Sequence, residues 1–253
     1  MKQLLLILFL LIVSTGNYFA QHYNFKGISV EQGLPRSGAY SLFEDSQGYL
    51  WVTLDGGGVA RFDGKNFKKF DLSDGLPSRK VRAIFEDSKQ NIWFGTTQGL
   101  CLYKNNRVKT FTTTNGLIHN YIRAITEDKS GNIIIGTNKG IDSYYDNTFH
   151  HLKDNLDSSF NLKTRTIYKS KDNKIWIGTE EGLFNIKENQ ITISKLNESL
   201  PNQTVLSLLK DSKDNLWIGT EEGVILHNKD STVLCLHSRS RTIVFHFCLT
   251  RYL

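Results

Sequence analysis

One short pattern occurs five times along the chain, and this repetition constrains the fold more than any other feature of the sequence. In its last copy the pattern reads KDSKDNLWIGTEEGV (residues 210–224): a polar turn, an apolar run around a tryptophan, and a second turn that ends in glycine. The five anchor positions, about 41 residues apart, are Trp51, Trp93, Ile134, Trp176 and Trp217. A fixed period of about forty residues indicates that each copy is one supersecondary unit of a repeat architecture.

Residues 75–111 show what one unit contains. Four short runs rich in β-branched and aromatic residues are separated by polar turns, which predicts strands at 81–85, 91–96, 100–103 and 107–111. The second run is apolar on both faces, as at Ile92, Trp93 and Phe94, so the sheet must be covered on both sides. Radial packing of successive sheets provides this cover. The sequence therefore predicts an all-β fold, a β-propeller of four-stranded antiparallel blades.

Five blades are visible in the sequence, and two arrangements of them are open. Residues 232–236 align with the fourth strand of the earlier units, which completes a fifth blade. The ring is either a closed five-bladed propeller or an incomplete part of a seven-bladed one. In both cases we expect the anchor side chains to fill the wedge between neighbouring blades, because Ile134 shows that the position requires apolar volume and not an indole.

The two ends of the chain differ from the repeats. Residues 1–20 combine a positive start, an apolar run and small residues before Ala20, which predicts a signal peptide. Cleavage after Gly16 and an uncleaved N-terminal anchor are the alternatives. We expect residues 21–232 to form the propeller repeats and residues 233–253 to be a divergent tail. The mature chain is expected to be periplasmic or secreted, with no membrane span after cleavage.

The tail contains no Asp, Glu or Gly and no further copy of the pattern, so truncation or a shifted reading frame after about Thr232 is the simplest interpretation. Its cysteines and histidines (Cys235, His237, His246 and Cys248) are zinc-ligand types, but their spacing fits no common zinc motif. The acidic turns before each anchor supply too few oxygens for calcium and are typical of Asx-stabilised hairpins. No metal and no cofactor are predicted. A net charge of +6, spread among acidic residues, does not predict nucleic-acid binding.

A ligand site is expected at one end of the propeller. In an antiparallel meander, the loop before each first strand and the turn between the second and third strands lie at the same end. Arg82, Arg123 and Arg165 share one first-strand position, where the other copies have Tyr40 and Leu206. These guanidinium groups could bind an acidic sugar or another small anion. Alternatively, each pairs with an acidic group of its own or the next blade. The candidate ligand-binding residues are Arg36, Arg79, Arg82, Asn120, Arg123, Arg165, Glu180 and Glu221.

The repeat also resembles a known family. The copy that carries the resemblance best contains Gly75-Leu76-Pro77, Val81, Ile84, Glu86-Asp87, Asn91, Trp93 and Gly95-Thr96. It is similar to the two-component regulator propeller repeat, and residues 22–232 are covered. The resemblance implies the N-terminal periplasmic sensor region of a hybrid two-component system, in which oligosaccharides are the usual ligands. The chain is then a truncated member whose sensor kinase modules are encoded separately or lost. It is expected to be a non-enzymatic sensor.

Two other functions are open. One is a propeller enzyme, either a glycosidase or similar to streptogramin lyase, for which Asp55, Glu180 and Glu221 are the available carboxylates. Glycoside hydrolysis requires two carboxylates at a defined separation. These three follow the repeat, whereas catalytic residues usually break one, so no catalytic residue is expected. The other is a non-functional truncated fragment with an exposed sheet edge.

Overall fold

The computed structural model describes residues 27–154, 162–228 and 231–237. The expected signal peptide (1–20) and most of the divergent tail lie outside the described residues. The described residues form five antiparallel sheets and four short 3-10 helices, which confirms the predicted all-β class. None of the helices in these three segments has the length and apolarity that crossing a membrane requires.

The sheets follow one another in chain order. The first contains β1 (Ala39–Glu44), β2 (Leu50–Leu54), β3 (Gly58–Phe62) and β4 (Phe67–Phe70). The second contains β5 (Val81–Glu86), β6 (Ile92–Thr96), β7 (Leu100–Lys104) and β8 (Arg107–Phe111). The third contains β9 (Ile122–Glu127), β10 (Ile133–Thr137), β11 (Ile141–Tyr145) and β12 (Thr148–His151). The fourth contains β14 (Thr164–Lys169), β15 (Ile175–Thr179), β16 (Gly182–Lys187) and β17 (Gln190–Ile193), with β13 (Lys153–Asp154) parallel to β17. The fifth contains β18 (Val205–Lys210), β19 (Leu216–Thr220), β20 (Gly223–His227) and β21 (Thr232–His237).

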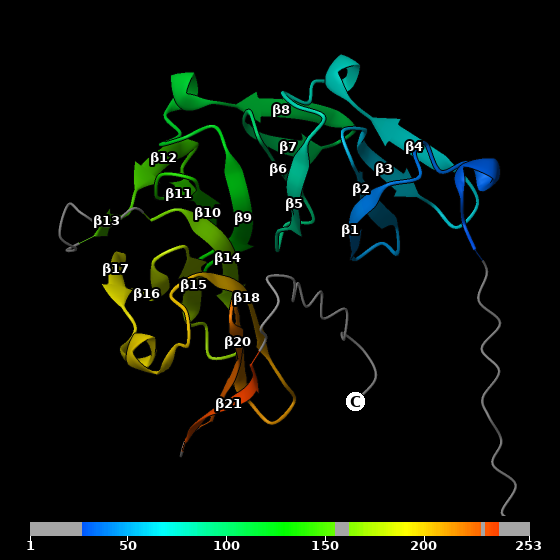
Figure 1. The fold of residues 1–253 in the computed structure, drawn as a ribbon. Coiled ribbons are helices and arrows are strands. Elements are labelled where there is room, and N and C mark those ends of the chain that lie inside the picture. The colour runs from blue at the N-terminus through cyan, green and yellow to red at the C-terminus, as the bar shows by residue number, and fades with distance from the viewer. Residues whose placement is uncertain (1–26, 155–161, 229–230, 238–253) are drawn as a thin grey trace, which may run out of the picture.

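Figure 1 shows the five sheets along an arc, with the first strand of each sheet toward its inside and the fourth toward its outside. The first strands pack against one another in the order β1, β5, β9, β14 and β18. Within the described residues, no packing of similar extent joins β18 to β1, so both predicted ring sizes stay open. The 3-10 helices η1 (Val30–Gln32), η2 (Leu72–Asp74), η3 (Thr113–Asn115) and η4 (Lys195–Ser199) lie in the connections that lead to first strands.

The anchor side chains fill the spaces between sheets, as predicted. The ring centroid of Trp51 lies 5.5 Å from that of Phe70 in its own sheet and 5.4 Å from that of Phe94 in the next sheet. Ile134 takes the same position in the third sheet and is 1% exposed, in one apolar cluster with Ile175 of the fourth. Apolar volume between adjacent sheets therefore holds the blades together.

An aspartate six residues before three of the four tryptophans accepts a hydrogen bond from the indole, a contact that the sequence reasoning missed. Trp51 Nε1 donates to Asp45 at 2.7 Å, and Trp93 Nε1 donates to Asp87 at 2.8 Å. The same carboxylates accept backbone N–H groups of their own turn, which confirms the predicted Asx hairpins. In the fourth sheet Ser170 replaces the aspartate, and Trp176 Nε1 is buried without a hydrogen-bond partner.

Neighbouring sheets are also joined by a glutamate–serine contact at the turns that connect the first strand of each sheet to the second. Glu86 accepts from the backbone N–H and the hydroxyl of Ser46 at 2.7 and 2.6 Å. Glu127 accepts from the same two groups of Ser88 at 2.9 and 2.7 Å. In both cases the carboxylate reaches back to the hairpin of the preceding sheet, so these contacts set the position of one blade against the next.

Candidate functional site

The predicted meeting of two loop types at one end of the propeller is confirmed. In four sheets, a residue of the turn after the second strand donates its backbone N–H to a carbonyl in the loop before the first strand. The pairs are Asp55 with Gly38, Thr97 with Lys80, Asn138 with Tyr121 and Glu180 with Lys163, at 2.8 to 3.2 Å. These bonds fix the turns beside the start of the innermost strands.

The three arginines sit at a β-bulge on these innermost strands. In each sheet the register between first and second strands skips one residue. The skipped residues are Tyr40, Arg82, Arg123, Arg165 and Leu206. A bulge re-aims the side chain of the extra residue and leaves it out of the regular pairing. The repeat therefore places one variable side chain per blade near the inside of the arc.

Arg82 has aromatic neighbours, and it is not paired with an acid in the part of the chain that the structure describes. Its guanidinium carbon lies 4.8 Å from the centre of the Tyr40 ring, a cation–π distance. Burial lowers the pKa of Arg82, but interactions with Tyr121 and Tyr40 outweigh burial and raise it. The Nε atom is buried and has no hydrogen-bond partner. The arginine therefore keeps its charge and at least one unused donor.

Arg123 is bound by an amide and an aromatic ring. Its Nε donates to Asn138 Oδ1 at 2.8 Å, and its guanidinium carbon lies 4.5 Å from the centre of the Tyr121 ring. Burial lowers the pKa of Arg123, and the nearby charges of Arg165 and Arg82 add to this effect. Interactions with Tyr121 and Glu180 act in the opposite direction, so both of the other arginines and Glu180 influence the charge of Arg123.

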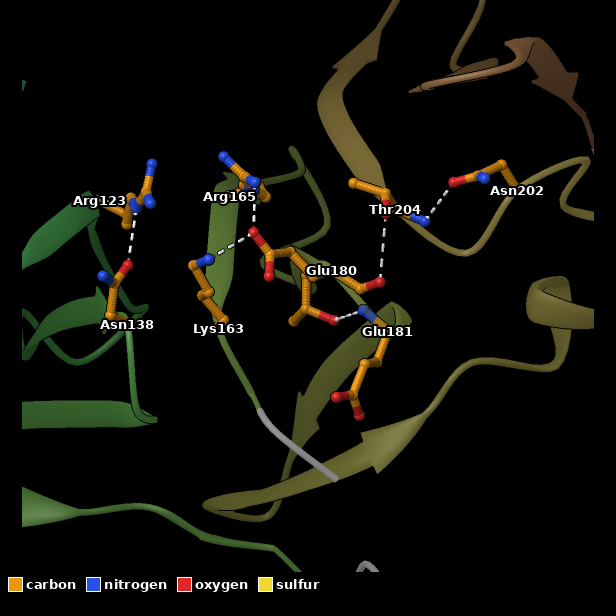
Figure 2. A network of polar contacts seen from close by, with 9 residues as sticks. Arg123, Asn138, Lys163, Arg165, Glu180, Glu181, Asn202 and Thr204 are labelled. Atoms are coloured by element: carbon orange, nitrogen blue, oxygen red, sulfur yellow. Dashed lines mark hydrogen bonds and ion pairs between the residues drawn. The ribbon is translucent and has the colours of Figure 1, made fainter. Parts of the chain in front are cut away.

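Arg165 differs because it is neutralised. Its Nη2 bonds to Glu180 Oε1, and Lys163 Nζ contacts the same oxygen at 2.8 Å (Figure 2). Burial opposes ionisation of Glu180, but Lys163 and Arg165 outweigh burial and lower its pKa. Figure 2 also shows the Glu181 carboxylate directed away from this cluster. The predicted alternative of a paired arginine is thus correct for Arg165, whereas Arg82 and Arg123 have no carboxylate partner within the described residues.

The remaining candidate residues lie apart from the three arginines. Arg36 donates to the Gly56 carbonyl at 3.1 Å, and Arg79 Nη2 lies 3.9 Å from Asp71. These two arginines line a common pocket outside the bulge positions. Asn120 accepts the Thr113 backbone N–H at 2.7 Å and so caps a connection. Glu221 is exposed in the turn between β19 and β20.

The structure adds residues that the sequence reasoning missed. Tyr121 and Asn138 contact Arg123 directly, and Lys163 contacts the Glu180 oxygen that binds Arg165. Asn138 and Glu180 could have been found, because each lies fifteen positions after the arginine that it binds. Thr97 takes this position for Arg82, but its hydroxyl bonds to that of Ser78 at 2.9 Å. The residue in this turn position decides whether an arginine is neutralised.

A second missed feature is a buried acid in the third sheet. Asp142 is fully buried at a position where the other copies have apolar residues such as Ala60 and Phe184. One oxygen contacts His151 Nδ1 at 2.5 Å, and the other accepts the Ile118 backbone N–H at 2.8 Å. Most copies have proline where Ile118 stands, and proline has no N–H to donate. Burial raises the pKa of Asp142, and the hydrogen bonds to Ile118 and His151, which lower it, only partly offset this effect.

Two of the three carboxylates considered for an enzyme, Glu180 and Glu221, differ in their surroundings. Glu180 is held by two cations, whereas Glu221 belongs to a different sheet and is exposed. Within the described residues, no group of three or more His, Cys, Asp or Glu side chains could hold a metal ion. The chemistry of this end is cationic and aromatic, which suits binding of an anion.

Comparison with known proteins places the repeat in a family. Residues 33–56, 75–98, 116–139 and 199–222 match the family described as two component regulator propeller. The copy that lacks a match is the one around Trp176, where the sequence reads SSF in place of GLP. No match was found among curated proteins.

Solved structures show the same fold. The chain is similar to the extracellular domain of a putative hybrid two component system from B. thetaiotaomicron, with 24% identity over 83% of this chain and 31% of that chain, at a TM-score of 0.68. It is similar to the extracellular domain of a putative one component system from the same organism, with 20% identity over 87% of this chain and 34% of that chain, at a TM-score of 0.69. Virginiamycin B lyase from Staphylococcus aureus matches with 17% identity over 78% of this chain and 69% of that chain, at a TM-score of 0.63. The chain spans about a third of the length of the two extracellular domains.

Proposed function

We propose that the chain, four of whose repeat copies match the two-component regulator propeller family, is a non-enzymatic sensor module that binds an acidic oligosaccharide or another small anionic ligand. The observation that carries this proposal is the pair Arg82 and Arg123 on adjacent innermost strands. Both are partly buried, and neither is bound by a carboxylate within the described residues. A desolvated cation without a counter-charge is costly, and an anionic ligand would supply that charge.

The surroundings of the two arginines favour an acidic sugar as the ligand. Guanidinium groups bind carboxylates through two parallel hydrogen bonds. Tyr40 is half exposed beside Arg82, and Tyr121 lies against Arg123. Tyrosine offers an apolar ring face with a polar hydroxyl, a combination that suits contact with sugar rings. Arg165 contributes less, because Glu180 already neutralises it.

The place of such a module in a cell follows from the same proposal. The solved relatives are extracellular domains of signalling systems, and residues 1–20 have the composition of a signal peptide. We therefore place the mature chain in the periplasm or outside the cell. Any signal would pass to sensor kinase modules encoded separately.

Isothermal titration calorimetry of the purified chain tests the proposal. The probes are an oligogalacturonate and a neutral glucan of the same length. We expect saturable binding of the acidic chain only, weaker at higher salt. Arg82→Ala and Arg123→Ala are each expected to weaken binding about tenfold, the usual effect of losing one charged hydrogen bond. Arg107→Ala, an exposed change on the outer strand β8, is the matched control and should leave binding unchanged.

Glu180→Gln gives an effect of opposite sign. It removes the acid that pairs with both Arg165 and Lys163, so the affinity for the acidic chain is expected to rise several-fold. Equal binding of the acidic and neutral chains would overturn the anionic part of the proposal. No binding of either by a chain whose circular dichroism shows a folded β-sheet protein would overturn the oligosaccharide part.

A further inference from the structure

A second group of cations lies outside the bulge positions, in a pocket of about 260 Å3 in the first blade. Its polar lining comes from Arg36, Lys69 and Arg79, and its floor is the turn at Gly56 and Gly57. None of the three arginines on the innermost strands lines this pocket. The pocket thus stands independently of the site described above.

The turn between β2 and β3 holds Arg36 across its surface. Arg36 Nη1 donates to the Gly56 carbonyl at 3.1 Å, which uses one donor of the guanidinium group. A Cβ atom at Gly57 would lie 2.8 Å from Leu54 Cβ and 3.2 Å from Arg36 Cδ. Glycine at this position therefore allows the arginine to lie close to the turn. The planar group is anchored on one side, and its other N–H groups are available to a ligand.

Lys69 and Arg79 share a single acidic neighbour. Lys69 Nζ lies 3.0 Å from Asp71 Oδ2, and Arg79 Nη2 lies 3.9 Å from the same oxygen. The interaction with Lys69, and then those with Ser73, hold the pKa of Asp71 well below its usual range. Asp71 is therefore ionised at neutral pH. The charged side chains that line the pocket are all cations, and Asp71 is the acid with which two of them pair.

This arrangement departs from the repeat. The residue in the position of Arg36 is Ser78 in the second copy and His119 in the third. In the second copy Ser78 instead bonds to Thr97, which joins the loop to the turn. Positions that break a repeat without serving the shared packing are where a specific function is expected.

We propose that Arg36, Lys69 and Arg79 form a binding site for a doubly charged oxyanion, a sulfate or phosphate group. Three lining cations from separate chain segments suit the charge and the tetrahedral oxygens of a dianion. The group is either free in solution or carried as an ester on a sugar.

Titration followed by NMR of the arginine Nε–Hε signals tests this site. The probes are inorganic sulfate and a monosaccharide sulfate, at constant ionic strength maintained with chloride. We expect saturable shifts for Arg36 and Arg79 but not for Arg82. Tighter binding of the monosaccharide sulfate would identify an ester as the ligand, and equal binding would identify the free anion. Shifts that grow linearly without saturation would overturn the proposal.

Variants separate the pocket from general surface charge. Arg36→Ala and Arg79→Ala are each expected to weaken sulfate binding about tenfold. Lys68→Ala is the matched control, because Lys68 lies next to Lys69 on β4 but contacts the Phe70 ring at 5.1 Å and does not line the pocket. Asp71→Asn keeps a side chain that can cap η2 and removes the competing charge, so affinity should rise about threefold. Equal losses in Lys68→Ala and Arg36→Ala, or weaker binding in Asp71→Asn, would contradict the site. Arg82→Ala should leave sulfate binding unchanged. A failure of the sulfate-site proposal can therefore be distinguished from a failure of the oligosaccharide proposal.

Discussion

Replacing Asp87 by serine, the residue found naturally at position 170, should destabilise the propeller through loss of one indole hydrogen bond. Asp87 is 6% exposed and accepts from Trp93 Nε1 at 2.8 Å. It also accepts the backbone N–H groups of Lys89 and Asn91, both at 2.9 Å. Trp93 is 3% exposed, so water cannot replace the lost acceptor. An unsatisfied buried donor costs about 1–3 kcal/mol, in addition to the cost of the weakened turn.

The chain contains its own control for the turn. Asp128 accepts two backbone N–H groups and one Asn132 amide in the same way, but Ile134 stands where the indole would be. Asp128→Ser therefore removes the turn bonds alone. We expect Asp87→Ser to lower the free energy of unfolding by about 1–3 kcal/mol more than Asp128→Ser does.

Urea unfolding at 25 °C, followed by far-ultraviolet circular dichroism, measures the difference. Losses in Asp87→Ser and Asp128→Ser that agree within about 0.5 kcal/mol would refute the reasoning, because they would show that the indole bond contributes nothing beyond the turn.

Two further predictions concern stability. Glu127→Gln should lower the free energy of unfolding in urea by about 2 kcal/mol, because the buried Glu127 carboxylate accepts two hydrogen bonds from Ser88 of the preceding blade. Glu44→Gln, at the equivalent exposed position, should change it very little. Similar losses in the two variants would contradict the inter-blade role of Glu127. For Asp142, burial raises the folded-state pKa above the unfolded value, so its contribution to stability is greatest in acid and is lost as pH rises through the folded pKa. From about pH 4 upward, the non-titrating variant Asp142→Asn should therefore gain stability relative to the parent, and a relative loss in urea unfolding across that range would refute the sign.

The packing of the blades could be predicted from the sequence because it repeats. Trp51 and Trp93 recur at a fixed spacing, and only a position between sheets explains apolar residues on both faces of the strands that carry them. The meeting of the two loop types at one end of the propeller could be predicted from the antiparallel order of the strands alone. By contrast, the Asp87–Trp93 bond was missed although both residues recur together, since the carboxylate was read only as a turn residue.

The individual partners of the arginines could not be predicted in the same way. Arg123 and Arg165 occupy equivalent positions, yet one binds Asn138 and the other Glu180. The β-bulge that brings these residues together is a backbone feature without a sequence signature of its own. Lys163 joins the cluster from a loop position that varies freely between copies. Charge balance at a site depends on such local differences, whereas the fold depends on what the copies share.

In the proposed site, Arg82 and Arg123 provide the positive charge that an acidic ligand binds. The most direct test records the arginine Nε–Hε NMR signals while the chain is titrated with the oligogalacturonate. We predict saturable shifts for Arg82 and for Arg123, neither of which is paired with a carboxylate within the described residues, with one common dissociation constant. The signal of Arg165 should move much less, because Glu180 holds its guanidinium group. A titration in which Arg165 moves most, or in which Arg82 and Arg123 do not move while binding heat is observed, would contradict the account.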